Sequence, residues 1–228
     1  MLERLDAFGT MTVGVHGVTT DRFCLVPGET KLRIRERLET VLQVPCIPLE
    51  VSFKRLIGVM VACNSNGILL PNHVHPNDEA IISKALEALP GPPVKVHVLE
   101  ESKPNALGNL IAANDTGAIA SIKIPETAMP SLESTLGVNV IQGKIANSSL
   151  VGTKIVANSK GVLVTPLASD EEANDIKVLF GVANVDFTTV CLGIEAIKVG
   201  MIANSHGAIV GNATSGPEMA RISDVLEI

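Results

Sequence analysis

The fold of this chain is decided by the ten-residue stretch VACNSNGILL at residues 61–70, in which two short aliphatic runs flank an Asn-x-x-Gly sequence. Asn opens tight turns by accepting hydrogen bonds from nearby backbone, and Gly adopts the positive φ angles that other residues resist. The stretch therefore predicts a β-hairpin with Asn64 and Gly67 at its turn, and with Gly67 at positive φ.

The same pattern recurs along the chain. It returns as IAANDTGAIA at 111–120, IVANSKGVLV at 155–164, MIANSHGAIV at 201–210 and, in degenerate form, GVTTDRFCLV at 17–26. The anchor positions 20, 64, 114, 158 and 204 are 44, 50, 44 and 46 residues apart, so five units use up the 228 residues. Repeats bury their apolar faces against neighbours, and five units without a polar capping repeat predict a closed ring.

A helical pattern follows each hairpin. Residues 78–89 place aliphatic side chains on one stripe, and the pairs Ser169/Glu172 and Ser215/Glu218 have capping-box spacing ahead of two other such patterns. Apolar stripes of the remaining helices contain Leu38, Val41 and Leu42 in the first unit and Met129, Leu132 and Leu136 in the third. Further strands are expected at 94–99, 138–141 and 182–187.

Each unit is therefore expected to read strand, hairpin, helix, in an α/β fold whose sheets are buried on both faces. We place the repeats at about 1–42, 43–90, 91–137, 138–181 and 182–228, within a single domain, from the even spacing of structural repeats.

Composition limits the class of protein. Hydrophobic residues make up 46% of the chain and charged residues 18%, with a net charge of −6 and no Trp or Tyr. No apolar run is long enough to span a membrane, and the first residues lack a signal-peptide pattern. The acidic total and the scarcity of aromatic residues disfavour generic nucleic-acid binding. We expect a cytoplasmic protein that has no membrane partner and meets any nucleoprotein largely through basic protein components.

Several segments in order carry a resemblance to a known family. They are Ala106-Leu107-Gly108-Asn109 with Asn114-Asp115 behind it, Leu56-Ile57-Gly58 with 64–72, and Leu150-Val151-Gly152. With them the chain resembles the translation initiation factor 6 family, whose fold is the pentein ring, a five-bladed α/β propeller with pseudo-fivefold symmetry. The chain stops at Ile228 without the polar tail of eukaryotic members, so the expectation is the archaeal form. The fifth repeat departs from the others, because Lys198 stands where they have glycine.

This resemblance implies a function without chemistry. Family members bind the intersubunit face of the large ribosomal subunit and sterically prevent the small subunit from joining, with a role in large-subunit maturation. The implied partners are a ribosomal protein of the uL14 type and neighbouring rRNA. The expectation is a monomer with no cofactor, no metal, no catalytic residue and no small-molecule substrate.

The resemblance also implies a set of ribosome-facing residues. It assigns contacts to Asn109, Val59 and Ala196, and the candidate surface is completed by Lys198 and Thr153. Within the repeat, the Asn109 slot holds Val15, Val59, Thr153 and Val199. The fold therefore does not require a polar residue there, which is an internal reason to assign Asn109 a function.

Two other classes of function remain open. Pentein relatives include guanidino-modifying enzymes with a Cys nucleophile, and a ring-shaped interaction module with another partner is a third reading. Covalent catalysis needs an exposed and activated thiolate. The slot of Cys63 holds Ala three times and Thr once, and that of Cys24 holds only small or apolar residues, so both are predicted to be buried structural thiols. Cys46 and Cys191 have no aligned slot and are weak candidates.

One pair of histidines has a spacing that could suit a metal site. His73 and His75 stand two residues apart and could share a metal on a strand, but Pro71 and Pro76 flank them and no third His or Cys lies nearby in the sequence. A solvated loop is the favoured interpretation.

Overall fold

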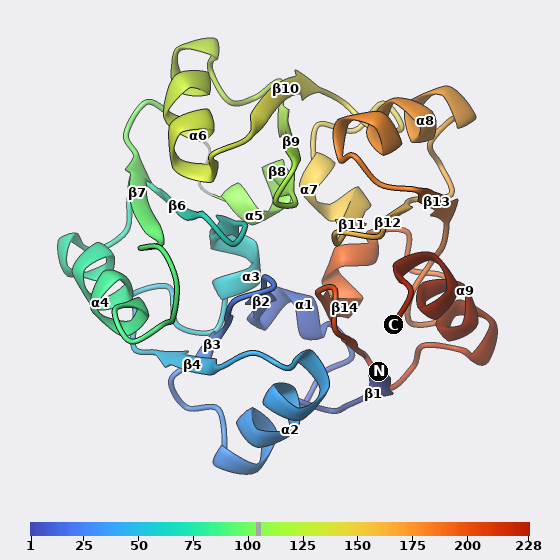
Figure 1. Cartoon of the computed structure of the whole chain (residues 1–228), viewed down its shortest axis with the longest axis horizontal. Coiled ribbons are helices and arrows are strands. Elements are labelled where there is room, and N and C mark those ends of the chain that lie inside the picture. Colours follow the sequence, from blue (N-terminus) through green and yellow to red (C-terminus); the bar gives the residue numbers. More distant parts are fainter. Residues whose placement is uncertain (104–105) are drawn as a thin grey trace.

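The computed structural model describes residues 1–103 and 106–228. Its strands form five three-stranded sheets, which stand around a common axis as a closed ring with the long helices on the outside (Figure 1). The predicted α/β pentein ring is thereby confirmed, and the five hairpin sequences each build one sheet.

Each sheet contains one hairpin and one further strand. The antiparallel hairpins are β2–β3 (Val18–Thr19, Cys24–Pro27), β5–β6 (Ala62–Cys63, Gly67–Pro71), β8–β9 (Ile111–Ala113, Gly117–Ser121), β11–β12 (Ile155–Ala157, Gly161–Val164) and β14–β15 (Met201–Ala203, Ala208–Val210). The third strands pair in parallel with the second hairpin strand, and they are β4 (Cys46–Leu49), β7 (Lys95–Leu99), β10 (Asn139–Gly143), β13 (Asn184–Phe187) and β1 (Leu2–Arg4).

The ring is closed by the N-terminal strand. β1 pairs with β15, with Leu2 opposite Ala208, so the fifth sheet is built from both ends of the chain. In the other four sheets the third strand follows the outer helix in sequence. The strand that opens each sequence repeat therefore pairs with the preceding hairpin, and a blade is offset from a repeat by one strand.

The outer helices are α2 (Leu32–Leu42), α4 (Pro76–Leu86), α6 (Met129–Leu136), preceded by the short η1 (Glu126–Ala128), α8 (Asp170–Leu179) and α9 (Gly216–Leu226). The capping boxes predicted for α8 and α9 are confirmed. The predicted span 78–89 was wrong at both ends, since α4 begins at Pro76 and ends at Leu86. His75 caps its N-terminus: the His75 ring accepts the N–H of Asn77, while the Asp78 carboxylate accepts the N–H of His75. Ile81, expected on the apolar stripe, is exposed.

The core lies largely at the junctions between blades. One buried cluster joins Leu69 and Leu99 of the second sheet to Leu132 of α6, and another joins Ile202 of the fifth sheet to Leu38 of α2. Each outer helix thus packs between its own sheet and that of the preceding blade. This arrangement is how a repeat buries an apolar face that it cannot cover alone.

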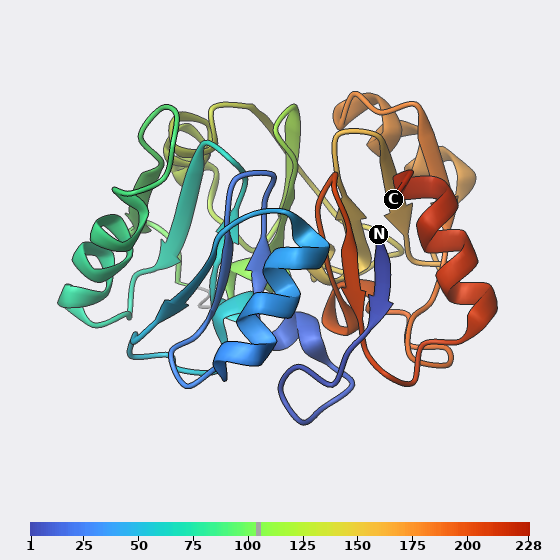
Figure 2. The ribbon, with the colours of Figure 1, turned by 60° about the horizontal axis from the view of Figure 1, so that its bottom comes forward.

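A second set of helices lies inside the ring and was not predicted. It consists of single turns: α1 (Val13–His16), α3 (Ile57–Met60), α5 (Leu107–Leu110), α7 (Val151–Lys154) and the 3-10 turn η2 (Ile197–Gly200). Neighbouring members contact one another around the axis. They lie below the hairpin turns, which form the upper rim in Figure 2.

Glycine at the start of α1, α3, α5 and α7 allows this close ring, whereas η2 has Lys198 at the corresponding position. A Cβ at Gly58 would lie 2.0 Å from the carbonyl oxygen of Gly14, and one at Gly108 would lie 2.2 Å from that of Gly58. Gly152 stands in the same relation to Gly108, at 2.4 Å. Real Cβ atoms do not approach backbone oxygens this closely, so α3, α5 and α7 each pack on the preceding inner helix through a position that excludes a side chain.

The turn glycines differ from the prediction. Gly67, Gly117, Gly161 and Gly207 are not among the glycines with positive φ, so the predicted conformation was wrong. Their role is close approach instead. A Cβ at Gly67 would lie 2.1 Å from the carbonyl oxygen of Thr135 near the end of α6, and the other three meet the next outer helix at similar distances.

The turn asparagines connect the blades. Asn64, Asn114 and Asn158 each accept backbone N–H groups of their own turn and donate through Nδ2 to the carbonyl of the next anchor residue, Asn204 being the last of these acceptors. Asn204 donates in turn to the carbonyl of Thr20, so four of the five blade junctions carry such a bond. Each amide also reaches the end of the next outer helix, at Leu136, Phe180, Leu226 and Leu42. The predicted turn-forming role is confirmed and extended to holding neighbouring blades together.

The degenerate first hairpin has Thr20 in place of the anchor asparagine, and Arg22 makes the connection to the next blade instead. Thr20 uses its hydroxyl only within its own turn, accepting the N–H groups of Arg22 and Phe23. The Arg22 guanidinium spans the junction to the second blade and donates to the carbonyl of Ser65 at 2.9 Å and to those of Pro90 and Pro92. The fifth junction is therefore bridged by a longer, charged side chain.

Candidate functional site

The inner-helix face, meaning the surface formed by α1, α3, α5, α7 and η2 with the residues that precede them, carries the residues assigned from the sequence. Asn109 lies in α5 and Val59 at the matching position of α3, and both are half-buried. Both residues lie in the helical turn that directly precedes a hairpin. The backbone N–H of Asn109 donates to Ala106, whereas its side-chain amide makes no hydrogen bond to another described residue.

The other three assigned residues differ in their accessibility. Ala196 directly precedes η2 and is half-buried. Thr153, in α7, is only 6% exposed, and its hydroxyl donates to the Leu150 carbonyl at 2.8 Å. Lys198 turns its ammonium group into the ring, where Nζ donates to the Gly108 carbonyl at 2.7 Å. A partner on this face can therefore reach little of the Thr153 side chain and not the bonded ammonium group of Lys198.

Large apolar side chains on the same face were missed from the sequence. Leu56 and Leu150 directly precede α3 and α7 and are 45% and 42% exposed. Met11 and Leu192 are also exposed, at 47% and 75%, and their loops are adjacent because the Cys191 thiol lies 3.4 Å from the Met11 carbonyl oxygen. Exposed apolar side chains concentrated on one face are typical of protein interaction sites.

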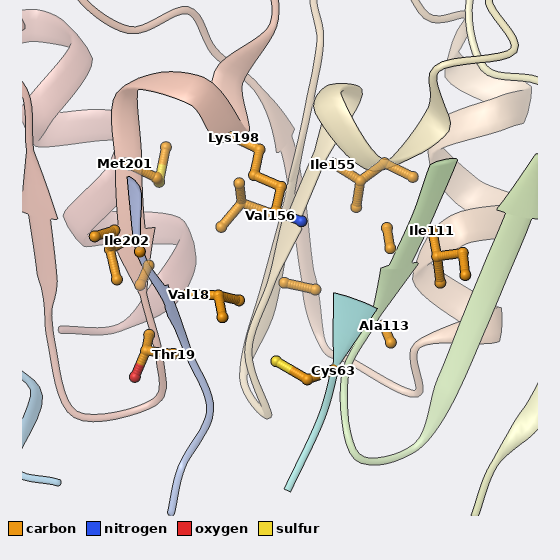
Figure 3. A pocket seen from close by; sticks show the side chains of 14 residues that line it. Val18, Thr19, Cys63, Ile111, Ala113, Ile155, Val156, Lys198, Met201 and Ile202 are labelled. Atoms are coloured by element: carbon orange, nitrogen blue, oxygen red, sulfur yellow. The ribbon is translucent and has the colours of Figure 1, made fainter. Parts of the chain in front are cut away.

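A cavity of about 70 Å³ lies on the ring axis behind these helices. Figure 3 shows Lys198 and Cys63 projecting into it among small and aliphatic residues of the first hairpin strands. Burial lowers the pKa of Lys198 to about 8, an effect that Cys63 partly opposes. Burial raises the pKa of Cys63 to about 12, although the nearby Lys198 acts in the opposite direction.

Cys24 and Cys191 are also disfavoured as nucleophiles. Cys24 is fully buried, as predicted, and its hydrogen bond to Cys46, together with burial, holds its pKa well above the ordinary value. Burial likewise raises the pKa of Cys191. Cys63 is half-buried on the cavity wall. The repeat has small residues at this position because their side chains face the ring axis. Since the thiolate is the nucleophilic form, the raised pKa values of Cys24, Cys63 and Cys191 disfavour nucleophilic attack at these three positions.

Replacing Cys63 by Ala is expected to change the free energy of unfolding by no more than about 1 kcal/mol, because a half-buried thiol at a cavity wall leaves little new void. The repeat itself places Ala in this slot at positions 113, 157 and 203. Urea unfolding followed by circular dichroism measures the effect. A loss of several times that size would show that Cys63 has a packing role that the repeat does not reveal.

The histidines considered as metal ligands have other surroundings. His75 is the N-cap of α4, and His73 is exposed in the loop before it. Within residues 1–103 and 106–228, no three His, Cys, Asp or Glu side chains gather in a way that could hold a metal ion. No helix in this part of the chain combines the length and apolar character needed to cross a membrane.

Comparison with known proteins covers nearly the whole chain. The model of the eIF-6 family matches residues 2–225. Translation initiation factor 6 of Pyrococcus horikoshii is 38% identical over 99% of this chain and 98% of its own length, and that of Thermococcus onnurineus is 36% identical over 99% and 97%. Among solved structures, a mutant of DDAH from Pseudomonas aeruginosa complexed with citrulline matches with a TM-score of 0.46 and 14% identity, over 77% of this chain and 68% of that one. The chain belongs to the eIF-6 family.

Proposed function

We propose that this chain is a translation initiation factor that binds the intersubunit face of the large ribosomal subunit and keeps the small subunit from joining. The observation that carries the proposal is the family match across residues 2–225, together with relatives named translation initiation factor 6 over almost their entire length. The proposed mechanism is steric. A monomeric ring seated on one subunit occupies space that the other subunit needs, and no cofactor or small-molecule substrate takes part.

The inner-helix face is the proposed contact surface. Exposed Leu56, Leu150 and Leu192 supply apolar anchors, and Asn109 adds a polar group whose amide has no partner among the described residues. Apolar anchors beside a few polar groups are what protein–protein interfaces use. With a net charge of −6, the ring suits a basic ribosomal protein of the uL14 type better than bare rRNA. Action on the ribosome places the protein in the cytoplasm and is compatible with a role in large-subunit maturation.

A non-enzymatic role is proposed over guanidino chemistry. That chemistry would require a thiolate, whereas the pKa values of Cys24, Cys63 and Cys191 are all raised. The proposed role needs only a shape and a contact surface. A ring that binds some other partner through the same face is the remaining candidate, and ribosome binding assays separate the two.

Replacing Asn109 by Ala is expected to weaken large-subunit binding about tenfold, because a lost polar contact inside an interface costs on the order of 1–2 kcal/mol. His206→Ala is the matched control. His206 is exposed at a hairpin turn, at the opposite end of the sheet from the inner helices, and the variant keeps its backbone hydrogen bond to Asn204.

The measurement is a titration of labelled chain with isolated large subunits at several salt concentrations, with circular dichroism to verify folding. We expect salt to weaken binding only moderately, since an acidic ring releases few phosphate counterions. If Asn109→Ala and His206→Ala bind equally well, Asn109 is not part of the contact surface.

A further inference from the structure

The cavity on the ring axis continues toward the hairpin turns. Its inner part, next to the single-turn helices, shares Thr19, Cys63 and Ala113 with an outer part that reaches the turns. The shared wall comes from the first strand of each hairpin. The two parts therefore lie one behind the other along the ring axis, with the inner helices at one end and the turns at the other.

Lys198 lies at the inner end of this space and crosses it. Its backbone belongs to η2, whereas the carbonyl that accepts its Nζ hydrogen bond belongs to Gly108 of α5. The helices on either side of η2 in the inner ring are α1 and α7, so α5 is not its neighbour. The side chain must therefore reach across the ring to α5. Figure 3 shows it projecting from its helical turn into the cavity.

The Lys198 ammonium group lacks a counter-charge. It has three donors, of which one is bonded to the Gly108 carbonyl, and none of the ion pairs between described residues includes it. The only other titratable side chain among the described residues that line the inner cavity is Cys63. Because its pKa is raised to about 12, this thiol is neutral at physiological pH and cannot balance the lysine.

A buried charge without a counter-ion is costly, and proteins normally pair it. The pKa of Lys198, about 8, leaves the ammonium group charged at neutral pH despite the burial. The cavity also has space beside it, since a volume of about 70 Å³ exceeds the ~10–15 Å³ that one water requires. A positive charge, free donors and room for a ligand thus coincide at the inner end of this space.

We propose that the central cavity is a binding site for a small monovalent anion, held beside the Nζ of Lys198. A volume of about 70 Å³ has room for a halide or an oxyanion of three or four heavy atoms. Asp21 and Asp115 line the outer part of the space, where their carboxylates accept the N–H groups of Ser205 and Ser65. These two acidic side chains disfavour multiply charged anions, which leaves monovalent ions as the class that fits.

Chloride NMR on the whole chain tests the site, because rapid exchange of chloride between solution and a protein site broadens the chloride signal. We expect the wild-type protein to cause excess broadening of the chloride signal. Bromide or nitrate should displace chloride from the site and remove the excess broadening, whereas bulky gluconate should not. Lys198→Met should remove the broadening, because it keeps the length of the side chain without its charge. Lys95→Met is the control, since Lys95 also donates to a backbone carbonyl, that of Ser134, but is exposed.

The pH dependence follows from the same lysine. Anion binding needs the charged ammonium group, so affinity should be constant below the pKa of Lys198 and should fall about tenfold for each pH unit well above it. A crystal grown in sodium bromide should show an anomalous peak within hydrogen-bonding distance of Nζ.

Three results would overturn the proposal: equal broadening by wild type and a folded Lys198→Met variant, no broadening by wild type at neutral pH, or bromide bound elsewhere with the cavity empty of it. If Lys198→Met does not fold, the pH series and the bromide crystal on wild type decide the question. None of these measurements depends on the ribosome, so the anion site and the proposed function stand or fall separately.

Discussion

Gly108→Ala is expected to cause a large loss of stability, because the added Cβ would collide with the backbone of the preceding blade. The added Cβ would lie 2.2 Å from the Gly58 carbonyl oxygen, 2.6 Å from that of Val61 and 3.0 Å from that of Val59. All three are backbone atoms, so no side chain can rotate away, and two blades must separate. We expect a loss on the order of 3–5 kcal/mol, at or beyond the upper end of usual overpacking costs.

Urea unfolding followed by circular dichroism measures this loss, with Gly216→Ala as the matched control. Gly216 is the first residue of α9, and a Cβ there would meet no atom within 4 Å. The control should be neutral or slightly stabilising, by up to about 1 kcal/mol, because Ala narrows the unfolded ensemble. A Gly108→Ala variant as stable as this control would contradict the close contact between the inner helices.

Asn114→Ala is expected to cost on the order of 2–4 kcal/mol, because it leaves several buried backbone groups without a partner. The Asn114 amide donates to the carbonyls of Asn158 and Phe180, at 3.0 and 2.9 Å, and its oxygen accepts the N–H groups of Thr116 and Gly117. Ala removes both the turn contacts and the connection to the next blade. The hairpin should loosen together with the junction.

The matched control is Asn66→Ala. Asn66 is exposed at the turn of the second hairpin and donates only one side-chain bond, to the Leu136 carbonyl, so its replacement should cost less than about 1 kcal/mol. Thermal unfolding and hydrogen exchange of the hairpin amides separate the two variants. Equal losses of stability would show that the buried amides do not hold the blades together.

The repeat made most of the fold predictable. Asn-x-x-Gly between aliphatic runs gave correct hairpins, and the Ser/Glu spacing before α8 and α9 gave correct helix starts. Both signals are local, and five copies reinforced each other. The inner helices escaped because a single turn is too short to show helical periodicity, and because glycine is a poor helix former.

Long-range contacts were the part that the sequence could not provide. Gly67 was predicted to need positive φ, whereas it has to leave space for the end of α6. That helix begins at Met129, far along the chain from Gly67. The role of Arg22, which donates hydrogen bonds to the carbonyls of Ser65 and Pro90 in the second blade, has no signal in the local sequence. Both roles depend on which blades are neighbours, and that follows only from the closed ring.

The candidate site shows the same division. The sequence placed Asn109 and Val59 at corresponding positions of one face, and the structure retains that correspondence. The direction of the Lys198 side chain could not be predicted, because it is set by the carbonyl of Gly108 across the axis. The exposed Leu56 and Leu150 were missed because an apolar residue before an aliphatic one resembles a buried strand.

The most direct test of the proposed function is a sucrose-gradient measurement with isolated ribosomal subunits. The chain is first incubated with large subunits, and small subunits are then added under conditions that normally form whole ribosomes. We predict that the chain comigrates with the large subunit, that the yield of whole ribosomes falls, and that Asn109→Ala reduces both effects while His206→Ala does not. A folded wild-type chain that stays at the top of the gradient at low salt, with undiminished subunit joining, would contradict ribosome binding as its function.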